Sequence, residues 1–312
     1  MKLFFKKILV FVGVIIAILT VLSMITKFYI NKNILDDANF QLGDSIKILI
    51  IGDSNIGLAL NPHYIPESDN QFLIAEHYLF SYVRLKYFLK NNPQIDKVVL
   101  GFSYSNIAIN YDERLFNSYQ KNAAFPKYFM LLNDEETSLL YSADLIFFRN
   151  YFGWQLGVPT KDNIPLIFKT HKKVPYKKLL PFRAYGSYNI NANYRTINYQ
   201  EVYFHFNSQY PELSSLSIEY LYNIVNLCEE YDKKLILYAS PLYPKYLELI
   251  PNYYINQFDS LSLELCKNKN ISFISHIGIV MPDSCYNDGN HLSGFGAKII
   301  SEKFAEDLND IK

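Results

Sequence analysis

The stretch from Ile46 to Ile51, "IKILII", constrains the fold most strongly, because five of its six residues are apolar. A strand that is exposed on one face alternates apolar and polar residues, whereas a strand buried on both faces carries a nearly continuous apolar run. Strands of the second kind are typical of parallel sheets that helices cover on both sides. The stretch therefore predicts an α/β fold with a parallel sheet.

The rest of the chain repeats this rhythm of short apolar strands and longer amphipathic helices. Further strands are expected at 70–75, 96–103, 233–240 and 271–276. Helices are expected at 55–60, 77–90, 213–230, 253–267 and 294–308. Strands that alternate with helices favour a doubly wound parallel sheet with helices on both sides, which is a three-layer α/β/α domain. The last helix places Ala297, Ile300, Phe304 and Leu308 on one face.

The N-terminus contains an uncharged apolar run from Ile8 to Thr26, which as a helix would span about 28 Å, close to the thickness of a bilayer core. Lys2, Lys6 and Lys7 precede the run, which favours a cytoplasmic N-terminus, although lysines also follow it. A cleaved signal peptide is the alternative, but the run is longer than usual and no small-residue cleavage site follows. A buried core helix would show a polar face. We expect a single-pass plasma-membrane anchor with the remaining chain in the periplasm or at the cell surface.

Composition along the chain divides it into an anchor at 1–27, a polar stalk at 28–44 and one discontinuous α/β domain. The domain is expected to comprise 45–106 and 211–312. Between its two parts, residues 107–210 are rich in Tyr, Phe and Asn and lack the regular strand and helix rhythm. This central insertion is interpreted as a cap or subdomain.

The charge balance and the cysteines exclude several function classes. The 30 basic and 30 acidic side chains cancel, so no basic surface predicts nucleic-acid binding. Cys228, Cys266 and Cys285 lack metal-binding spacing and are interpreted as core thiols. We expect neither a metal nor a cofactor. The basic segment 168–183 would bind an anionic polymer or lipid headgroups, or would simply be a solvated loop, which is the more common case.

The tripeptide Gly-Asp-Ser occurs on each side of the first strand. Ligands of open parallel sheets bind beyond the carboxyl ends of the strands. Ser45 precedes the strand and is interpreted as a turn residue, whereas Ser54 follows it, where the chain turns into a helix. Backbone N–H groups at that turn would stabilise an oxyanion. The tripeptide alone is weak evidence, since its residues also form ordinary turns and caps.

A serine nucleophile needs a base, and the sequence "YNDGNHLSGFG" offers one. Asp288 stands three residues before His291, in a loop ahead of the last helix, whose first turn Ser293 can cap. A turn at this spacing brings the carboxylate onto the imidazole and fixes its tautomer, which leaves the other nitrogen to accept the proton of Ser54.

The blocks "IIGDSN" and "DGNH", in this order and at opposite ends of an α/β domain, resemble the SGNH or GDSL-like hydrolase superfamily. The resemblance covers about 46–106 and 213–308. It implies Ser54 as nucleophile, His291 as general base and Asp288 as the carboxylate that orients the histidine.

The resemblance also implies an oxyanion hole, with departures from the family pattern. The family's three donors are the backbone N–H of the serine, a glycine and an asparagine. The serine is Ser54, Ala75 in "LIAEHYLF" stands at the glycine position, and Asn106 in "LGFSYSN" is the nearest match to the asparagine, with Ser103 as another candidate.

Other polar residues follow the expected strand ends. Glu76 would be a pocket acid or part of the first turn of a helix, and His63 and His77 are more readily surface or hydrogen-bonded histidines than substrate ligands. Residues expected to line the substrate pocket are Asp53, Asn55, Ser103, Ser240 and Tyr243.

An anchored, extracytoplasmic SGNH-like domain with an insertion resembles bacterial proteins that modify surface polymers, such as relatives of alginate O-acetyltransferases and the anchored component of teichoic-acid D-alanylation. The resemblance implies a serine esterase or O-acyltransferase that acts on ester groups of an envelope glycan, with an integral membrane acyl donor protein as a candidate partner. The alternative is a non-catalytic polysaccharide-binding or assembly protein. If both motifs were coincidental turns, Ser54 and His291 would lie far apart.

Overall fold

The computed structural model describes residues 2–34, 40–116, 128, 131–140, 199–206 and 211–311. The chain forms two compact units, Met1–Asn39 with Phe116–Pro181 and Phe40–Leu115 with Phe182–Lys312. The second unit contains the whole sheet. The sequence-based domain boundaries stay predictions, and the basic segment 168–183 lies outside the described residues.

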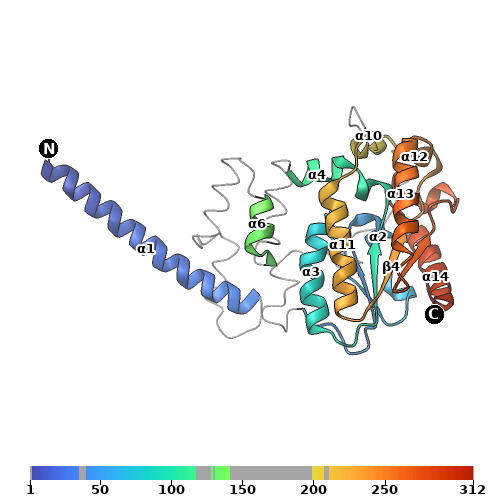
Figure 1. The fold of residues 1–312 in the computed structure, drawn as a ribbon, viewed down its shortest axis with the longest axis horizontal. Helices are drawn as coiled ribbons and strands as arrows, with labels where there is room; N and C mark the ends of the chain where they lie inside the picture. Colours follow the sequence, from blue (N-terminus) through green and yellow to red (C-terminus); the bar gives the residue numbers. More distant parts are fainter. Residues whose placement is uncertain are drawn as a thin grey trace. The chain divides into compact units, whose positions relative to one another are not determined.

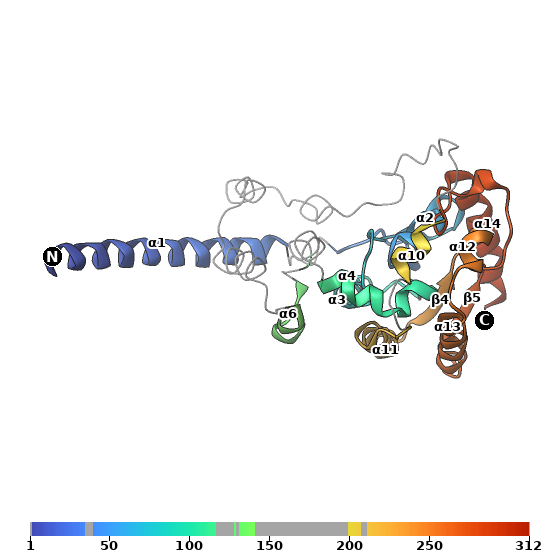
Figure 2. The same cartoon turned by 90° about the horizontal axis from the view of Figure 1, so that it is seen from above.

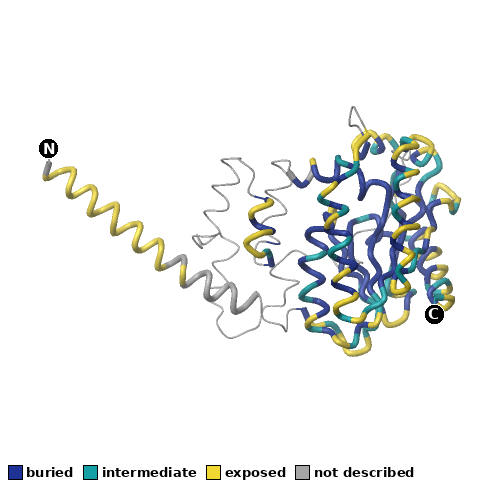
Figure 3. The backbone as a smooth tube through the Cα atoms, in the orientation of Figure 1, coloured by how far each residue is buried: buried dark blue, intermediate teal, exposed yellow. Residues whose placement is uncertain are grey.

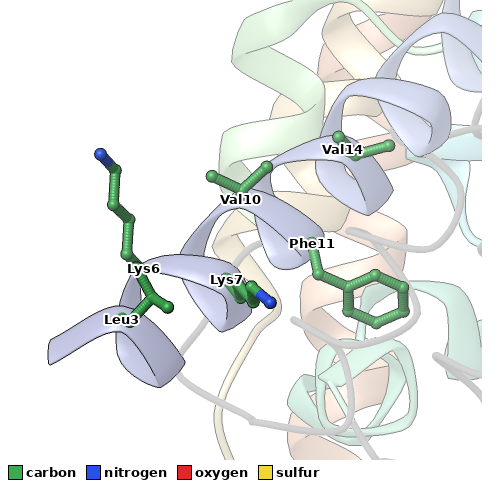
Figure 4. Close-up of a pocket in the computed structure, with 6 residues that line it drawn as sticks. All are labelled: Leu3, Lys6, Lys7, Val10, Phe11 and Val14. Atoms are coloured by element: carbon green, nitrogen blue, oxygen red, sulfur yellow. The ribbon is translucent and has the colours of Figure 1, made fainter. Parts of the chain in front are cut away.

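The first unit begins with helix α1, Lys2–Ile34, which continues into the region expected to be a stalk (Figure 1). Its segment Leu3–Val21 is long and apolar enough to cross a membrane, and a signal sequence would pass the same test. Val10, Phe11 and Val14 are exposed, and Figure 4 shows them with Lys6 and Lys7 at the start of the helix. Exposed apolar side chains on a helix that begins with lysines are more compatible with a lipid environment than with water.

The second unit is built on a five-stranded sheet in which every neighbouring pair is parallel. The strand order is β2-β1-β3-β4-β5. The strands are β1 Ile48–Ile51, β2 Ser68–Asn70, β3 Lys97–Gly101, β4 Lys234–Ala239 and β5 Ile271–Ser275. Because the chain passes from β1 to β2 on one side and then to β3 on the other, the order reverses between β1 and β3. Crevices for ligands form at such switch points.

Helices cover both faces of the sheet, which confirms the predicted three-layer fold (Figure 2). On one face, α2 and α14 pack against Ile50, Val99 and Ile236 in one continuous core. On the other face lie α3, α11 and α13, where Phe258 of α13 stacks on Phe102 at 4.3 Å between ring centroids. These helices are α2 Ser54–Ala59, α3 Tyr78–Asn91, α11 Ser215–Glu230, α13 Asn252–Leu265 and α14 Gly294–Asp310.

Burial explains why the strand sequences are apolar throughout. Leu49, Val98 and Leu237 alternate with the residues of the first core and are fully buried as well, so both faces of the central strands are covered (Figure 3). The predicted face of α14 is also buried, with Ile300 and Phe304 fully inaccessible.

The described residues also form shorter elements, of which α6 belongs to the first unit. They are η2 Pro62–Tyr64, η3 Tyr104–Ile107, α4 Ile109–Phe116, α6 Asp134–Leu140, α10 Glu201–His205, α12 Pro244–Glu248 and η5 Asp283–Cys285. An isolated antiparallel bridge joins Ala108 to Leu213. This bridge brings together the two ends of the region predicted to be an insertion.

The structure corrects two predictions and confirms a third. The strand expected at 70–75 is wrong, since β2 ends at Asn70; beyond it Leu73 still donates to Gly52 before the chain turns. Cys266 is exposed and is no core thiol, whereas Cys228 and Cys285 are buried. Ser45 does lie in a turn, closed by the Ile46 N–H donating to the Gly43 carbonyl at 2.9 Å.

Candidate active site

Ser54 is placed at the carboxyl edge of the sheet by the turn that follows β1. Gly52 in this turn has φ +135°, and a Cβ there would lie 3.1 Å from the Gly101 backbone nitrogen. Only glycine fits this backbone and this close approach. Asp53 then caps α2 by accepting from the Asn55 N–H at 2.9 Å. Ser54 is the first residue of the helix, where a backbone N–H has no acceptor within the helix.

Ser54, His291 and Asp288 form one hydrogen-bonded chain. Ser54 Oγ lies 2.8 Å from His291 Nε2. The Nδ1 atom of His291 lies 2.8 Å and 3.0 Å from the two carboxylate oxygens of Asp288. With Nδ1–H donating to Asp288, Nε2 is the nitrogen that accepts the serine proton. The two motifs are therefore in contact, which refutes the interpretation that they are unrelated turns.

The loop that carries the histidine is organised by its own aspartate. Asp288 Oδ1 accepts from the backbone N–H groups of Asn290 at 3.0 Å and His291 at 2.8 Å. The Asn287 N–H donates to the His291 carbonyl at 2.9 Å, which closes the loop. Ser293 then caps α14 as expected, accepting from Gly296. A short local turn thus produces the spacing read from the sequence.

The electrostatics of the site favour the protonated form of the histidine. Burial lowers the pKa of His291, but the hydrogen bond to Asp288 and the charges of Asp288, Glu201 and Asp53 outweigh it. The pKa of His291 therefore lies above its ordinary value of 6.5. An imidazole with a raised pKa is a stronger base and holds a transferred proton more firmly.

Asn106 is engaged behind the serine. Its Nδ2 donates to Asp53 Oδ2 at 2.9 Å, and its Oδ1 accepts from the Ser103 N–H at 2.9 Å. Asn55 reaches Ser103 Oγ at 3.4 Å. All four side chains are buried. This network joins the turn after β1 to the turn after β3, while oxyanion or substrate contacts by Asn106, Asp53, Asn55 and Ser103 stay predictions.

Ala75 lies in a turn with φ +53°, a backbone conformation that favours the glycine of the family pattern. The residues after it hold the turn in place. Glu76 is fully buried and pairs with Arg84, so it is not a pocket acid. His77 caps α3 and lies 3.0 Å from Asp112, so it is hydrogen-bonded rather than exposed to substrate. Ala75 itself is exposed at the site edge of the sheet.

Ser240 and Tyr243 follow β4, as expected. Ser240 is buried. Tyr243 packs edge-on against Tyr286, and its N–H donates to the Gly289 carbonyl at 3.0 Å. This segment therefore supports the histidine loop; a contact with substrate stays a prediction.

The sequence did not indicate Glu201 and Asn290 as part of the site. Among the described residues, Glu201, Asp288 and His291 bring potential metal-ligating atoms within 4.8 Å of one another. However, both imidazole nitrogens already have partners in Ser54 and Asp288. Metal binding to this histidine would have to displace one of them.

Fold and site together define a three-layer α/β/α domain with a serine–histidine–aspartate arrangement at the carboxyl edge of its sheet. No protein-family model and no curated protein matches the chain. Among solved structures, the chain is similar to one described as "a putative platelet activating factor from Streptococcus pneumonia". The TM-score is 0.42 and the identity 12%, over 91% of each chain.

Proposed function

We propose that the chain is an SGNH-like serine esterase or O-acyltransferase that acts on ester groups. The single observation that carries the proposal is the geometry of the triad, in which Ser54 Oγ lies 2.8 Å from His291 Nε2 and Asp288 holds the opposite nitrogen. These distances lie within the range expected for a nucleophile and its base, about 2.6–3.2 Å.

Each half of the proposed reaction transfers the acyl group from one oxygen atom to another. Ser54 Oγ attacks the ester carbonyl carbon while its proton passes to His291 Nε2. The tetrahedral oxyanion collapses, the C–O bond to the alcohol breaks, and the alcohol takes the proton from the imidazolium. An acyl ester on Ser54 remains. In the second half, His291 deprotonates water or an acceptor hydroxyl, whose oxygen attacks the acyl carbon. The second tetrahedral oxyanion collapses, the bond between the acyl carbon and Ser54 Oγ breaks, and Ser54 takes the proton back from the imidazolium. The product is a carboxylic acid when water attacks and a new ester when an acceptor hydroxyl attacks.

The substrate in this proposal is an ester of a cell-envelope glycan, and the protein acts outside the cytoplasm from the plasma membrane. The apolar helix α1 supports the anchor. Transfer of the acyl group to a hydroxyl, rather than its hydrolysis, requires a site that excludes water. For the transfer reaction, the proposed partner is an integral membrane protein that donates the acyl group.

A non-catalytic polysaccharide-binding or assembly role is the second candidate. The observation in its favour is the amide of Asn106, which is held in the network behind the serine: one of its two N–H donors is directed to Asp53, and its oxygen accepts from Ser103. An esterase whose oxyanion hole lacks one donor would react more slowly, by a factor of about 10²–10³.

Labelling with a fluorophosphonate serine probe, followed by peptide mass spectrometry, tests the proposed function. The full-length chain in detergent should be labelled at Ser54. Ser54→Ala should fold normally and lose the label, whereas Ser45→Ala, which alters the matching residue before β1, should retain it. Absence of labelling in a folded wild-type sample would contradict the proposal and favour the binding role.

A further inference from the structure

Glu201 brings a second carboxylate to the triad from outside the two motifs. It begins α10, which lies near the end of the predicted insertion. Its carboxylate lies with atoms of Asp288 and His291 in a group no more than 4.8 Å across. Glu201 is partly exposed. A residue far from both motifs in sequence is thus adjacent to the proposed base.

Asn290 links the two carboxylates. With its amide nitrogen toward them, Asn290 donates to Asp288 Oδ1 and to Glu201 Oε2, each at 3.1 Å. In the opposite orientation the nitrogen donates to Asn55 at 3.0 Å, but the amide oxygen then faces both carboxylates. Two acceptors around an amide oxygen repel it, so the first orientation is the favourable one when the Asn55 amide turns as well and donates its nitrogen to the Asn290 oxygen at 3.0 Å.

The position of α10 is fixed by contacts with the histidine loop and with α12. His205 Nδ1 lies 2.5 Å from the hydroxyl of Tyr246, which is buried in α12. A Cβ on Gly289 would lie 3.1 Å from the Tyr199 Cα, so the backbone before α10 lies directly against this loop. Glu201 is therefore held in place by packing on each side of it in sequence.

We propose that Glu201 is a positioning residue for the serine–histidine pair, whose carboxylate, held by Asn290 beside Asp288, stabilises the imidazolium that forms when Ser54 gives up its proton. The inference rests on the proposed function and deepens it. It assigns to the end of the insertion an electrostatic part in the acyl chemistry, beyond the three residues of the motifs.

Three acidic groups face His291: Asp288 from its own loop, Glu201 from α10 and Asp53 from the turn before α2. Removing the charge of Glu201 takes away one interaction that raises the pKa of the imidazole. The rate at which Ser54 reacts falls at low pH, where His291 is protonated, and this acid limb of the pH profile should then move to lower pH. Above the limb, the weaker base should react more slowly, by up to about tenfold.

The experiment measures the rate of Ser54 labelling by the fluorophosphonate probe between pH 5 and 9, a range that includes the ordinary pKa of histidine, about 6.5, and extends further above it than below. The full-length chain in detergent is compared with Glu201→Gln, Glu201→Asp and Glu230→Gln. Glu230 is exposed at the end of α11, near the start of β4 and thus at the opposite edge of the sheet. We expect the limb to move to lower pH in Glu201→Gln alone, with Glu201→Asp close to wild type.

An unchanged limb in Glu201→Gln, with robust labelling, would overturn the inference and leave the proposed function intact. If no variant is labelled, the proposed function fails, and an NMR titration of the His291 ring, assigned with His291→Gln, still tests Glu201. A midpoint that falls in Glu201→Gln but not in Glu230→Gln supports the electrostatic role. Equal midpoints in all three proteins refute it.

Discussion

Arg84 and Glu76 form an ion pair in the core of the second unit, and Arg84→Met is the perturbation from which we expect the largest effect on stability. Both side chains have 0% exposure. Arg84 Nη1 donates to the two carboxylate oxygens of Glu76 at 2.6 Å and 2.8 Å, and Nη2 donates to the Gln71 carbonyl. Ser81 Oγ adds one more donor to Glu76 at 3.2 Å.

The magnitude follows from the charge that the substitution leaves behind. Without Arg84, the Glu76 carboxylate is buried with Ser81 as the remaining side-chain donor named above, and breaking a buried pair in this way costs about 3–5 kcal/mol. A typical domain is stable by about 5–15 kcal/mol, so the loss is a large fraction of the total. The pair also ties the turn of Ala75 to α3, and labelling of Ser54 should fall with it.

The double variant Glu76→Leu/Arg84→Met separates the charge from the packing. It removes both ions and, of the hydrogen-bonding groups named above, leaves Gln71 and Ser81 without these partners, at about 1–3 kcal/mol for each unsatisfied group. The double variant should therefore be more stable than Arg84→Met alone. If the destabilising effects of the two substitutions were additive, it would instead be less stable.

Urea unfolding of the full-length proteins in one detergent, followed by far-UV circular dichroism, measures these differences. Lys90→Met also replaces a basic side chain by methionine, at an exposed position of the same helix, and it should change the free energy of unfolding by no more than about 0.5 kcal/mol. If Arg84→Met changes it by less than about 1 kcal/mol, or if the double variant is the less stable, the reasoning about the buried charge is refuted.

Two further predictions concern the site itself. His291 must be neutral to accept a proton and its pKa is raised above 6.5, so Ser54 labelling should be lost as pH falls through a midpoint above that value. Asp288→Asn should move the midpoint down and slow labelling by up to about 10⁴; a midpoint at or below 6.5 in wild type would contradict this assignment. Gly52→Ala should lower the melting temperature and the labelling rate, because the left-handed backbone adds about 1–3 kcal/mol of strain and the new Cβ lies 3.1 Å from the Gly101 nitrogen. Gly278→Ala, where nothing lies within 4 Å of the new Cβ, should behave as wild type, and equal effects of the two substitutions would count against the geometry.

The sequence predicted the central strands because a strand that is buried on both faces is apolar at nearly every residue. β1, β3 and β4 are almost wholly apolar, and each was found within two residues of its observed start. β2 has the sequence Ser-Asp-Asn and gives no such signal. Its place at the edge of the sheet is set by pairing with β1, a long-range contact that propensity does not encode.

The triad was predictable for a different reason. Asp288 and His291 interact through a local turn, and Ser54 follows a recognisable strand. The contact between them could then be predicted from the rule that the carboxyl ends of parallel strands lie at one edge of the sheet, where ligands bind. Glu201 has no local signal, because its proximity to His291 comes from packing of α10 on the histidine loop. For the same reason, the sequence did not show that Asn106 would donate to Asp53.

The topology explains why the end of the predicted insertion can take part in the site. The chain leaves the sheet after β3, at the carboxyl edge, and returns to α11, which must begin at that edge to run back toward the start of β4. The two ends are joined there, since Ser214 donates to the Ile107 carbonyl at 2.9 Å and Ile109 donates to the Glu212 carbonyl at 3.0 Å. Residues added at this point change the surroundings of Ser54 and His291 without altering the register of any strand. A Glu201→Gln effect on the His291 titration would therefore show that the insertion tunes the proposed chemistry, whereas its absence would leave the insertion outside the reaction.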